Sequence, residues 1–372
     1  MRILIFANTP AHVHLYRHAV DRLEEAGHDV LVLTREYACT TELLEFFGLP
    51  YRPYGEHDVA ATSKLAIGRE LGGQLGTIVR ETVRFRPDVV FGRGPYAALA
   101  GTVSRAPTVL VLDDEPGEFN HTASRPFADC ILSPRVTRRE LGADHYTFDG
   151  FKECAYLHPA VFDVDGAVRE YLGVDPDEPY ALVRFNALDA LHDAGLEGFT
   201  GRQRRDLIER LSDRVTVFVS DEGNEMDLRE LPARPYDLHP ALIHDAMAEA
   251  SLLLADTGTM VTEAGLLGTP ALRYRGTDDH EYGEFRELER VGLAEQFDSY
   301  EAVRDRALEL LADDSADERW QRRRRTYVGD LVNLTELLVE VAEASGDLEA
   351  LDRSSRAALR PASATRSPDT SG

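Results

Sequence analysis

Short apolar runs alternate with longer amphipathic segments along most of the chain, and this rhythm constrains the fold most strongly. Strands that alternate with helices form parallel sheets with helices on both faces. The pattern therefore predicts an α/β fold built from doubly wound, Rossmann-like sheets. In the first half the predicted strands are 3–7, 29–33, 89–91, 108–112, 130–132 and 146–148, and the predicted helices are 15–26, 41–47, 64–85 and 96–104.

The rhythm stops and restarts once, which predicts two domains. Residues 1–162 form the first Rossmann-like domain, 163–179 form an acidic link with several glycines and prolines, and 180–344 form the second domain. Its last helices are expected to pack back toward the first domain. Residues 345–372 are rich in serine, alanine, proline and charge, so we expect a disordered tail. Two such halves imply a cleft where ligands bind.

The chain of 372 residues is strongly acidic, with a formal net charge of −25. Lys64 and Lys152 are its only lysines, so arginine supplies almost all positive charge. Acid excess with lysine depletion is typical of proteins from a salt-rich, halophilic cytosol, because such a surface stays hydrated when salt screens its self-repulsion. The charge argues against nucleic-acid binding, which needs a basic face.

No apolar run approaches the roughly 18 residues of a membrane span. The N-terminus reads as a short strand rather than a secretory signal, so we expect a soluble, cytoplasmic protein. Three widely spaced cysteines without a CxxC pair suit free thiols and predict no metal site. The sequence also lacks a GxGxxG after the first strand and a P-loop, so no cofactor is predicted.

One strand–turn–helix unit stands out at 252–270. An apolar strand is followed by a turn of small polar residues, and the helix after it ends at Gly268 with Pro270 just beyond. Small residues in such a turn let a ligand approach the backbone closely. An ordinary turn of an α/β fold explains the same residues equally well.

The helix of this unit begins near Gly258, Thr259 and Met260, whose amides have no partners within the helix. Such amides are a ready site for a phosphate. Glu263 lies one turn further along, and its side chain leans back toward the helix start. A carboxylate there suits a neighbouring diol, such as a ribose, better than a phosphate.

The turn after the first strand contains two histidines. His12 is expected in the turn and could act as a general base, because the unperturbed pKa of histidine lies near neutrality. His14, at the expected helix start, could contact a substrate. Capping or another structural hydrogen bond is the competing explanation for both.

Carboxylates follow the predicted strand 108–112 at its carboxyl end. Asp114 and Glu115 could bind a divalent ion or the hydroxyls of a sugar. In so acidic a chain they could equally be solvated loop charges.

Polar residues also follow the first strand of the second half, 181–185. Arg184 could neutralise a phosphate, Asn186 could bind sugar or phosphate oxygens, and His192 could contact a substrate. Arg273, on the strand after the 252–270 unit, has the same possible role as Arg184. An ion pair with a nearby carboxylate is the alternative for both arginines.

One set of stretches carries a family resemblance: Thr9 to His14, Gly27 to Val30, Asn120, Gly150 to Glu153, Arg184-Phe185 and Asp256 to Ala264. Together they resemble the DUF354 family, a largely uncharacterised group, mostly archaeal and bacterial, with a glycosyltransferase-B-like (GT-B-like) architecture. The resemblance covers about residues 1–335. More distantly, the chain is similar to non-hydrolysing UDP-N-acetylglucosamine 2-epimerases and to the N-acetylglucosaminyl transferase of peptidoglycan synthesis.

The resemblance implies roles for the residues singled out above. It places His12 where the peptidoglycan transferase has a first-loop histidine, Gly258 to Met260 on the turn that binds the donor diphosphate, and Glu263 on the acid that holds the ribose. Two departures stand out. Thr257-Gly258 replaces the usual glycine pair, and the Thr-Glu-Arg-Pro run of the epimerases is absent, with Arg273 to Gly276 in its place.

The function expected from these observations is a metal-independent glycosyltransferase that uses a nucleotide-activated sugar, with a UDP-sugar as the expected donor. The acceptor is unidentified, and a glycan or a lipid-linked glycan would fit. A nucleotide-sugar 2-epimerase is the alternative within the same class. A non-catalytic protein that binds sugar nucleotides is the alternative of another class. The oligomeric state is left open.

Overall fold

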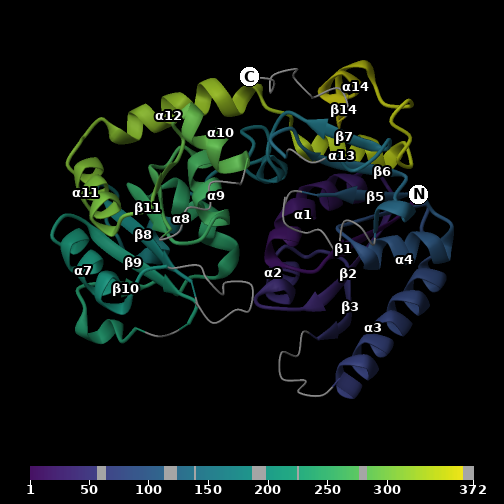
Figure 1. Ribbon diagram of the computed structural model, residues 1–372, viewed down its shortest axis with the longest axis horizontal. Helices are drawn as coiled ribbons and strands as arrows, with labels where there is room; N and C mark the ends of the chain where they lie inside the picture. The colour runs from purple at the N-terminus through teal and green to yellow at the C-terminus, as the bar shows by residue number, and fades with distance from the viewer. Residues whose placement is uncertain are drawn as a thin grey trace, which may run out of the picture. The chain divides into compact units, whose positions relative to one another are not determined.

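The protein is described here by a computed structural model that covers residues 1–56, 64–112, 124–137, 140–186, 198–223, 226–275 and 283–362. The chain divides into two compact units, shown in Figure 1. Unit 1 is Met1–Val161 with Leu331–Gly372, and unit 2 is Phe162–Asp330.

Unit 1 contains a sheet of eight strands in the described part of the chain, in the order β14-β7-β6-β5-β4-β1-β2-β3. Neighbouring strands run parallel except for β14, which runs antiparallel to β7 at one edge. The strands are β1 (Arg2–Ala7), β2 (Asp29–Glu36), β3 (Tyr51–Glu56), β4 (Val89–Gly92), β5 (Thr108–Val111), β6 (Cys130–Pro134), β7 (His145–Phe148) and β14 (Leu359–Pro361).

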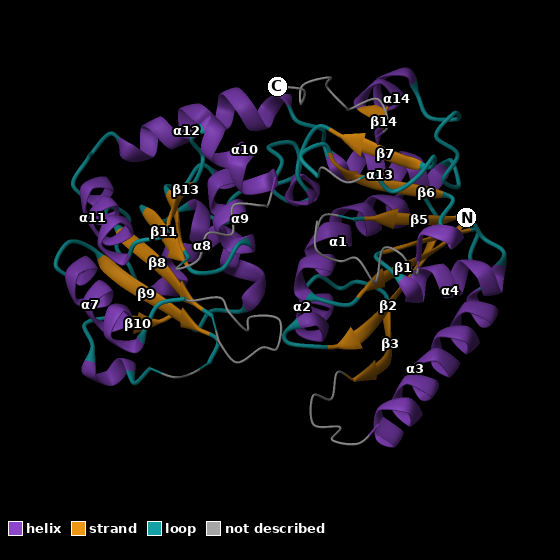
Figure 2. Cartoon of the chain, in the orientation of Figure 1, coloured by secondary structure: helices purple, strands orange, loops and turns teal. Residues whose placement is uncertain are grey.

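Helices cover both faces of this sheet, as Figure 2 shows. Right-handed crossovers from β1 to β2 to β3 put α1 and α2 on one face, and the return path to β4 and β5 puts α3 and α4 on the other. The helix α13 packs on α1. The helices are α1 (Pro10–Glu25), α2 (Thr40–Phe46), α3 (Lys64–Phe85), α4 (Pro95–Ser104), α13 (Leu334–Glu343) and α14 (Arg353–Ala358), with 3₁₀ turns η1 (Arg125–Phe127) and η2 (Lys152–Ala155).

The core of unit 1 follows from its central apolar strands, because β1, β4 and β5 are buried on both faces. On the face of α3 and α4, Leu4 and Phe6 of β1 pack in one cluster with Ile78 of α3 and Ala97 of α4. Continuous apolar runs of this kind are typical of parallel sheets.

Unit 2 contains a sheet of six parallel strands in its described residues, in the order β10-β9-β8-β11-β12-β13. The strands are β8 (Tyr180–Phe185), β9 (Thr216–Asp221), β10 (Arg234–Pro235), β11 (Leu252–Ala255), β12 (Ala271–Tyr274) and β13 (Glu295–Phe297). The helices are α6 (Val168–Leu172), α7 (Gly201–Ser212), α8 (Ile243–Ala248), α9 (Thr259–Leu267), α10 (Gly283–Val291), α11 (Tyr300–Leu311) and α12 (Ala316–Tyr327), with η3 (Leu228–Glu230), η4 (Pro240–Leu242) and η5 (Val328–Asp330).

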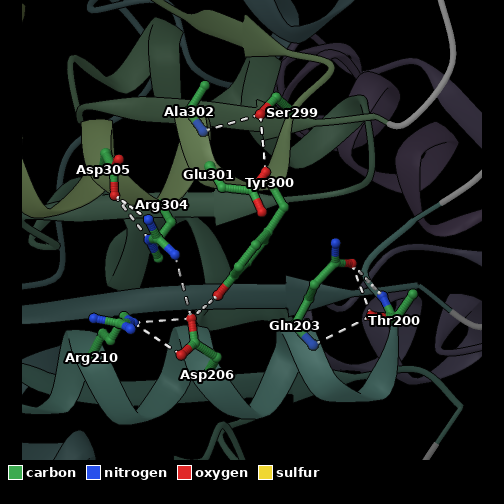
Figure 3. A network of polar contacts seen from close by, with 10 residues as sticks. All are labelled: Thr200, Gln203, Asp206, Arg210, Ser299, Tyr300, Glu301, Ala302, Arg304 and Asp305. Atoms are coloured by element: carbon green, nitrogen blue, oxygen red, sulfur yellow. Dashed lines mark hydrogen bonds and ion pairs between the residues drawn. The ribbon is translucent and has the colours of Figure 1, made fainter.

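A polar network joins α7 to α11 (Figure 3). Asp206 accepts hydrogen bonds from the Tyr300 hydroxyl at 2.5 Å and from Arg210 Nε at 3.0 Å. The Tyr300 hydrogen bond is the main cause that lowers the pKa of Asp206. The ring of Tyr300 packs edge-on against Phe199, whose ring lies beside Tyr274 at the end of β12. The network thus holds α11 against α7 and against the carboxyl end of the sheet.

Three boundaries differ from those predicted. The predicted link, 163–179, lies inside unit 2 and contains α6. The segment from Leu331 onward belongs to unit 1. The predicted disordered tail is wrong for 353–361, because α14 forms there and β14 pairs with the edge strand β7. Residues 363–372 lie outside the described part.

Two further differences concern single elements. The helix α1 begins at Pro10, five residues before the predicted start, because Thr9 caps it and Pro10 occupies its first turn. The strand β3 was not predicted because it contains Pro53 and Gly55, which strands tolerate mainly at edges and bulges. It is the edge strand of its sheet.

Among the described residues, none of the helices combines the length and the apolar character that a membrane crossing needs.

Candidate functional site

The strand order of unit 2 defines a topological switch point between β8 and β11. From β8 the chain continues to β9 on one side, and from β11 it continues to β12 on the other. Crossovers of one hand therefore carry the connections after β8 and β11 to opposite faces of the sheet. Open α/β sheets bind ligands at the carboxyl ends of the strands at such a point. The residues there are Asn186 after β8 and Asp256 to Gly258 after β11.

The turn between β11 and α9 leaves the start of α9 without a side-chain cap. Gly258 is the N-cap residue, and the first helical hydrogen bond runs from Thr262 N–H to Gly258 O at 3.1 Å. The amides of Thr259 and Met260 thus precede the hydrogen-bonded ladder of the helix. The predicted phosphate-binding residues lie at this turn, as the sequence indicated.

Two side chains of the turn have buried atoms with no hydrogen-bond partner among the described residues: Oδ2 of Asp256 and Oγ1 of Thr257. The other oxygen of Asp256, Oδ1, accepts from Asn186 N–H at 2.9 Å and so joins the two strand ends. Burial raises the pKa of Asp256 above its ordinary value of 3.8, while the Asn186 amide and Arg204 oppose this shift. Buried polar atoms are normally satisfied, so these two are exceptions among the described residues.

Arg273 of β12 lies beside the same turn. Its guanidinium is 4.1 Å from the ring centre of Phe285 and donates to Gln296 Oε1 at 2.8 Å. A Cβ atom at Gly258 would lie 4.0 Å from Arg273 Nη2 and 3.0 Å from Phe285 Cζ. Only glycine therefore fits here without moving Phe285. The structure brings Arg273, predicted from the sequence, next to the predicted phosphate turn.

Glu263 of α9 is 5% exposed, and its Oε1 lies 3.1 Å from Nε2 of His244 on α8. An ionised carboxylate can only accept, so His244 donates this hydrogen bond. His244 was not predicted from the sequence, because nothing in the helical pattern of α8 indicates its partner.

Arg204 is a second residue that the sequence did not reveal. It is 2% exposed, and its guanidinium donates to the carbonyl oxygens of Phe199 and Asn186, each at 3.0 Å. It also lies 3.5 Å from Asp221 Oδ1 at the end of β9. One buried cation on α7 therefore fixes the loops after two neighbouring strands. In the sequence it was one arginine among several of an amphipathic helix.

The structure shows an ion pair for Arg184. It donates to Ser220 Oγ and to Glu222, so the carboxylate pairing considered above for this residue is present. Asn186 uses its backbone rather than its side chain in the contacts described: its N–H donates to Asp256 and its carbonyl accepts from Arg204.

Unit 1 has its own switch point, between β1 and β4. The turn after β1 is held by its own side chains. Thr9 Oγ1 accepts from His12 N–H at 3.4 Å, and His12 Nδ1 accepts from Asn8 N–H at 3.2 Å. Asn8 Oδ1 in turn accepts from the Tyr54 hydroxyl at 2.9 Å.

His12 lies in the first turn of α1, not in the loop before it, and is 8% exposed. Because Nδ1 accepts the hydrogen bond of the Asn8 amide, the neutral ring carries its own proton on Nε2. In this arrangement Nε2 is a donor, and His12 can act as a base only if the Asn8 contact breaks. His14 is also buried, with its ring 5.8 Å from that of Phe47 and 5.4 Å from that of Tyr156.

Three predicted residues, Asp114, Glu115 and His192, lie outside the described residues. Within the described ranges, no group of three or more histidine, cysteine or acidic side chains is arranged to hold a metal ion.

Comparison with solved structures gives full-length similarity at low sequence identity. A provisionally assigned UDP-N-acetylglucosamine 2-epimerase from Listeria monocytogenes matches with a TM-score of 0.67 and 18% identity, covering 95% of this chain and 98% of that one. The spinosyn forosaminyltransferase SpnP matches with a TM-score of 0.65 and 17% identity, covering 93% of this chain and 100% of that one. The UDP-GlcNAc 2-epimerase from Neisseria meningitidis was solved with UDP-GlcNAc. It matches with a TM-score of 0.60 and 13% identity, covering 92% of this chain and 98% of that one.

These matches define the class: the chain has the GT-B-type fold that glycosyltransferases and nucleotide-sugar epimerases share. The profile of the family described as "Protein of unknown function (DUF354)" matches residues 1–319, and the chain belongs to this family. The uncharacterised protein MJ0665 of Methanocaldococcus jannaschii is 23% identical over 280 residues, which cover 71% of this chain and 79% of that protein.

Proposed function

We propose that unit 2 binds a nucleoside diphosphate sugar and that the protein is a glycosyltransferase for this donor. The observation that supports the proposal most directly is the β11–α9 turn at the switch point. It combines helix amides that have no side-chain cap with buried atoms of Asp256 and Thr257 that have no partner within the described ranges. Two of the proteins named above are described as UDP-N-acetylglucosamine 2-epimerases, and one of them was solved with UDP-GlcNAc, which suits a donor of this class.

Each group at the turn suits one part of such a donor. The first amides of α9, Thr257 Oγ1 and the Arg273 guanidinium are donors and suit the diphosphate. Asp256 Oδ2 and the Glu263 carboxylate are acceptors, and acceptors suit the hydroxyls of the sugar and the ribose. When the bond from the sugar to the diphosphate breaks, negative charge develops on the leaving phosphate. Preorganised donors at that position stabilise the charge without having to reorganise.

We propose His12 as the catalytic histidine of the reaction. As a base it removes the proton of the acceptor hydroxyl through Nε2. This requires that Nδ1 releases the Asn8 amide and that the ring proton moves from Nε2 to Nδ1. As an Nε2–H donor it instead binds a substrate oxygen. Two substitutions separate these roles. His12→Ala lowers turnover by about 10²–10⁴-fold in both cases, whereas His12→Gln, which retains an N–H donor, recovers activity only if His12 is a donor.

The first experiment is calorimetric titration of the protein with UDP and with uridine. We expect UDP to bind at least ~10-fold more tightly, because the charged diphosphate contacts are worth about 1.5–3 kcal/mol each. An exposed, paired arginine of the same unit provides a control: Arg290→Gln, which removes a partner of Glu287, should leave both affinities unchanged. Failure of UDP and other nucleoside diphosphates to bind would exclude the proposal.

A second experiment separates transfer from 2-epimerisation, the alternative that the epimerases of this fold support. The protein is incubated with UDP-N-acetylglucosamine in deuterated water, and the products are followed by NMR and mass spectrometry. Transfer, or slow transfer to water, releases UDP and leaves the hydrogen at C2 of the sugar unchanged. Deuterium at C2 with formation of the epimer would replace the transferase proposal by the epimerase. Binding without any reaction, across a range of donors and acceptors, would leave a sugar-nucleotide-binding protein.

A further inference from the structure

We propose that His244 is a positioning residue that holds the Glu263 carboxylate in place for the ribose diol of a bound nucleotide. This inference rests on the proposed nucleotide site and concerns one residue that the sequence did not reveal. His244 lies on α8 and Glu263 on the neighbouring helix α9, and the Nε2–Oε1 distance is 3.1 Å. The two side chains are 1% and 7% exposed.

The burial of Glu263 requires such a partner. A carboxylate removed from water costs several kcal/mol unless hydrogen bonds compensate for it. The Nε2–H of His244 supplies one such bond and also fixes one rotamer of a side chain that is otherwise long and flexible. The neighbouring acid on α8, Asp245, is engaged elsewhere, because its Oδ1 accepts from Asp165 N–H at 2.7 Å.

A purely structural contact would not need a carboxylate. The amide oxygen of a glutamine accepts from His244 equally well and carries no charge to desolvate. A carboxylate, however, accepts at both oxygens, with about four lone-pair sites, so one hydrogen bond from His244 leaves further acceptor capacity. Glu263 also lies four residues after Thr259, in the turn of α9 that follows the phosphate-binding turn. An acid at this distance from a diphosphate suits two adjacent hydroxyls.

The role predicts a specific loss. Without His244 the Glu263 carboxylate loses a hydrogen bond that orients it, so its preference for hydroxyls should fall while the diphosphate contacts of the Gly258 turn remain. Discrimination between a ribose and a ribose without hydroxyls is therefore the quantity that His244 controls.

The test compares UDP with 2′,3′-dideoxy-UDP by calorimetry. For the unaltered protein we expect UDP to bind about 10-fold more tightly or more, because hydrogen bonds to a charged group are lost with the hydroxyls. In His244→Leu the ratio should fall to about 3 or less, as it should in Glu263→Gln, and His244→Gln should restore part of it because its amide can donate to Oε1. His239→Asn is the matched control: His239 caps η4 through Ala241 N–H at 3.1 Å, and its replacement should leave the ratio unchanged.

The outcomes separate this inference from the proposed function. If the unaltered protein binds no nucleoside diphosphate, both are wrong. If UDP binds and Glu263→Gln reduces the ratio, but His244→Leu weakens both nucleotides equally and keeps the ratio, only the role of His244 is wrong. Should His244→Leu fail to fold, His244→Asn gives the same information, because its shorter side chain retains a polar group but does not reach Oε1.

Discussion

The turns after β1 in unit 1 and after β11 in unit 2 occupy the same position in their sheets but use their polar groups differently. Each follows a strand at a topological switch point and begins a helix. In unit 1 Thr9 caps α1, and His12 and Asn8 hydrogen-bond each other. In unit 2 Gly258 provides no side-chain cap to α9, and Asp256 and Thr257 have buried atoms without a partner in the described part of the chain.

Under the proposed function, this difference makes one helix start structural and leaves the other available to a ligand. A capped N-terminus has already satisfied part of its unpaired amides, so an anion there gains less. A glycine N-cap saves space and leaves the amides to an incoming group. The substitutions below test whether the difference in hydrogen bonding is also a difference in function.

The largest effect is expected from placing a negative charge at the N-cap of α9, as in Gly258→Asp. The new carboxylate occupies the place of the diphosphate, and two like charges about 4 Å apart repel by about 4 kcal/mol at an effective dielectric constant near 20. We expect UDP to bind ~100-fold more weakly or worse, as measured by calorimetry.

Gly258→Ala is the control for steric effects, because its Cβ makes the same 3.0 Å approach to Phe285 without adding a charge. It should lose distinctly less affinity than Gly258→Asp. Equal losses in the two variants would mean that space, not charge, makes the turn selective, and the comparison would then lose its electrostatic basis.

A smaller effect is expected at the turn of unit 1. Thr9→Ala removes the hydroxyl that caps His12 N–H, so the protein should lose about 1 kcal/mol of folding stability, as for other N-caps. Denaturant unfolding of the full chain measures this loss, and UDP affinity should stay within error. A loss of UDP affinity without a loss of stability would show that the turn of unit 1 is not structural, and the contrast between the two turns would be wrong.

Periodicity predicted much of the fold. The strands β1, β4, β11 and β12 and the helix α3 lie where the alternation of apolar residues indicated. What it did not predict depends on partners far away in the chain. The edge strand β14 forms because β7 offers unpaired backbone groups, and no local pattern of a Ser- and Ala-rich segment shows that.

The site shows the same division. The small residues at Gly258 and the arginine at Arg273 have sequence signals, since a βα turn and a strand end have recognisable positions. The partners His244 and Arg204 do not, because each acts through packing between helices and loops that are distant in the sequence. The helix start at Pro10 was predictable, because a threonine followed by proline is a frequent N-cap pair. The prediction nevertheless assigned residues 10–14 to the loop before the helix.

The smallest effect is expected from Asp256→Asn, which keeps the acceptor for Asn186 N–H and removes only the ionisable group. Burial raises the pKa of Asp256 in the folded state above its ordinary value of 3.8. Folding then favours the protonated form, so this group destabilises the fold as pH rises from below 3.8 through the raised folded pKa. The variant should therefore melt at nearly the same temperature as the unaltered protein below this range and at a higher temperature above it. Melting curves measured across the acid range test this sign, and a variant that melts at a lower temperature than the unaltered protein above this range would mean that Arg204 and the Asn186 amide outweigh burial. Asp256 would then be a satisfied structural acid, and the unpartnered Oδ2 would no longer distinguish the turn of unit 2 from that of unit 1.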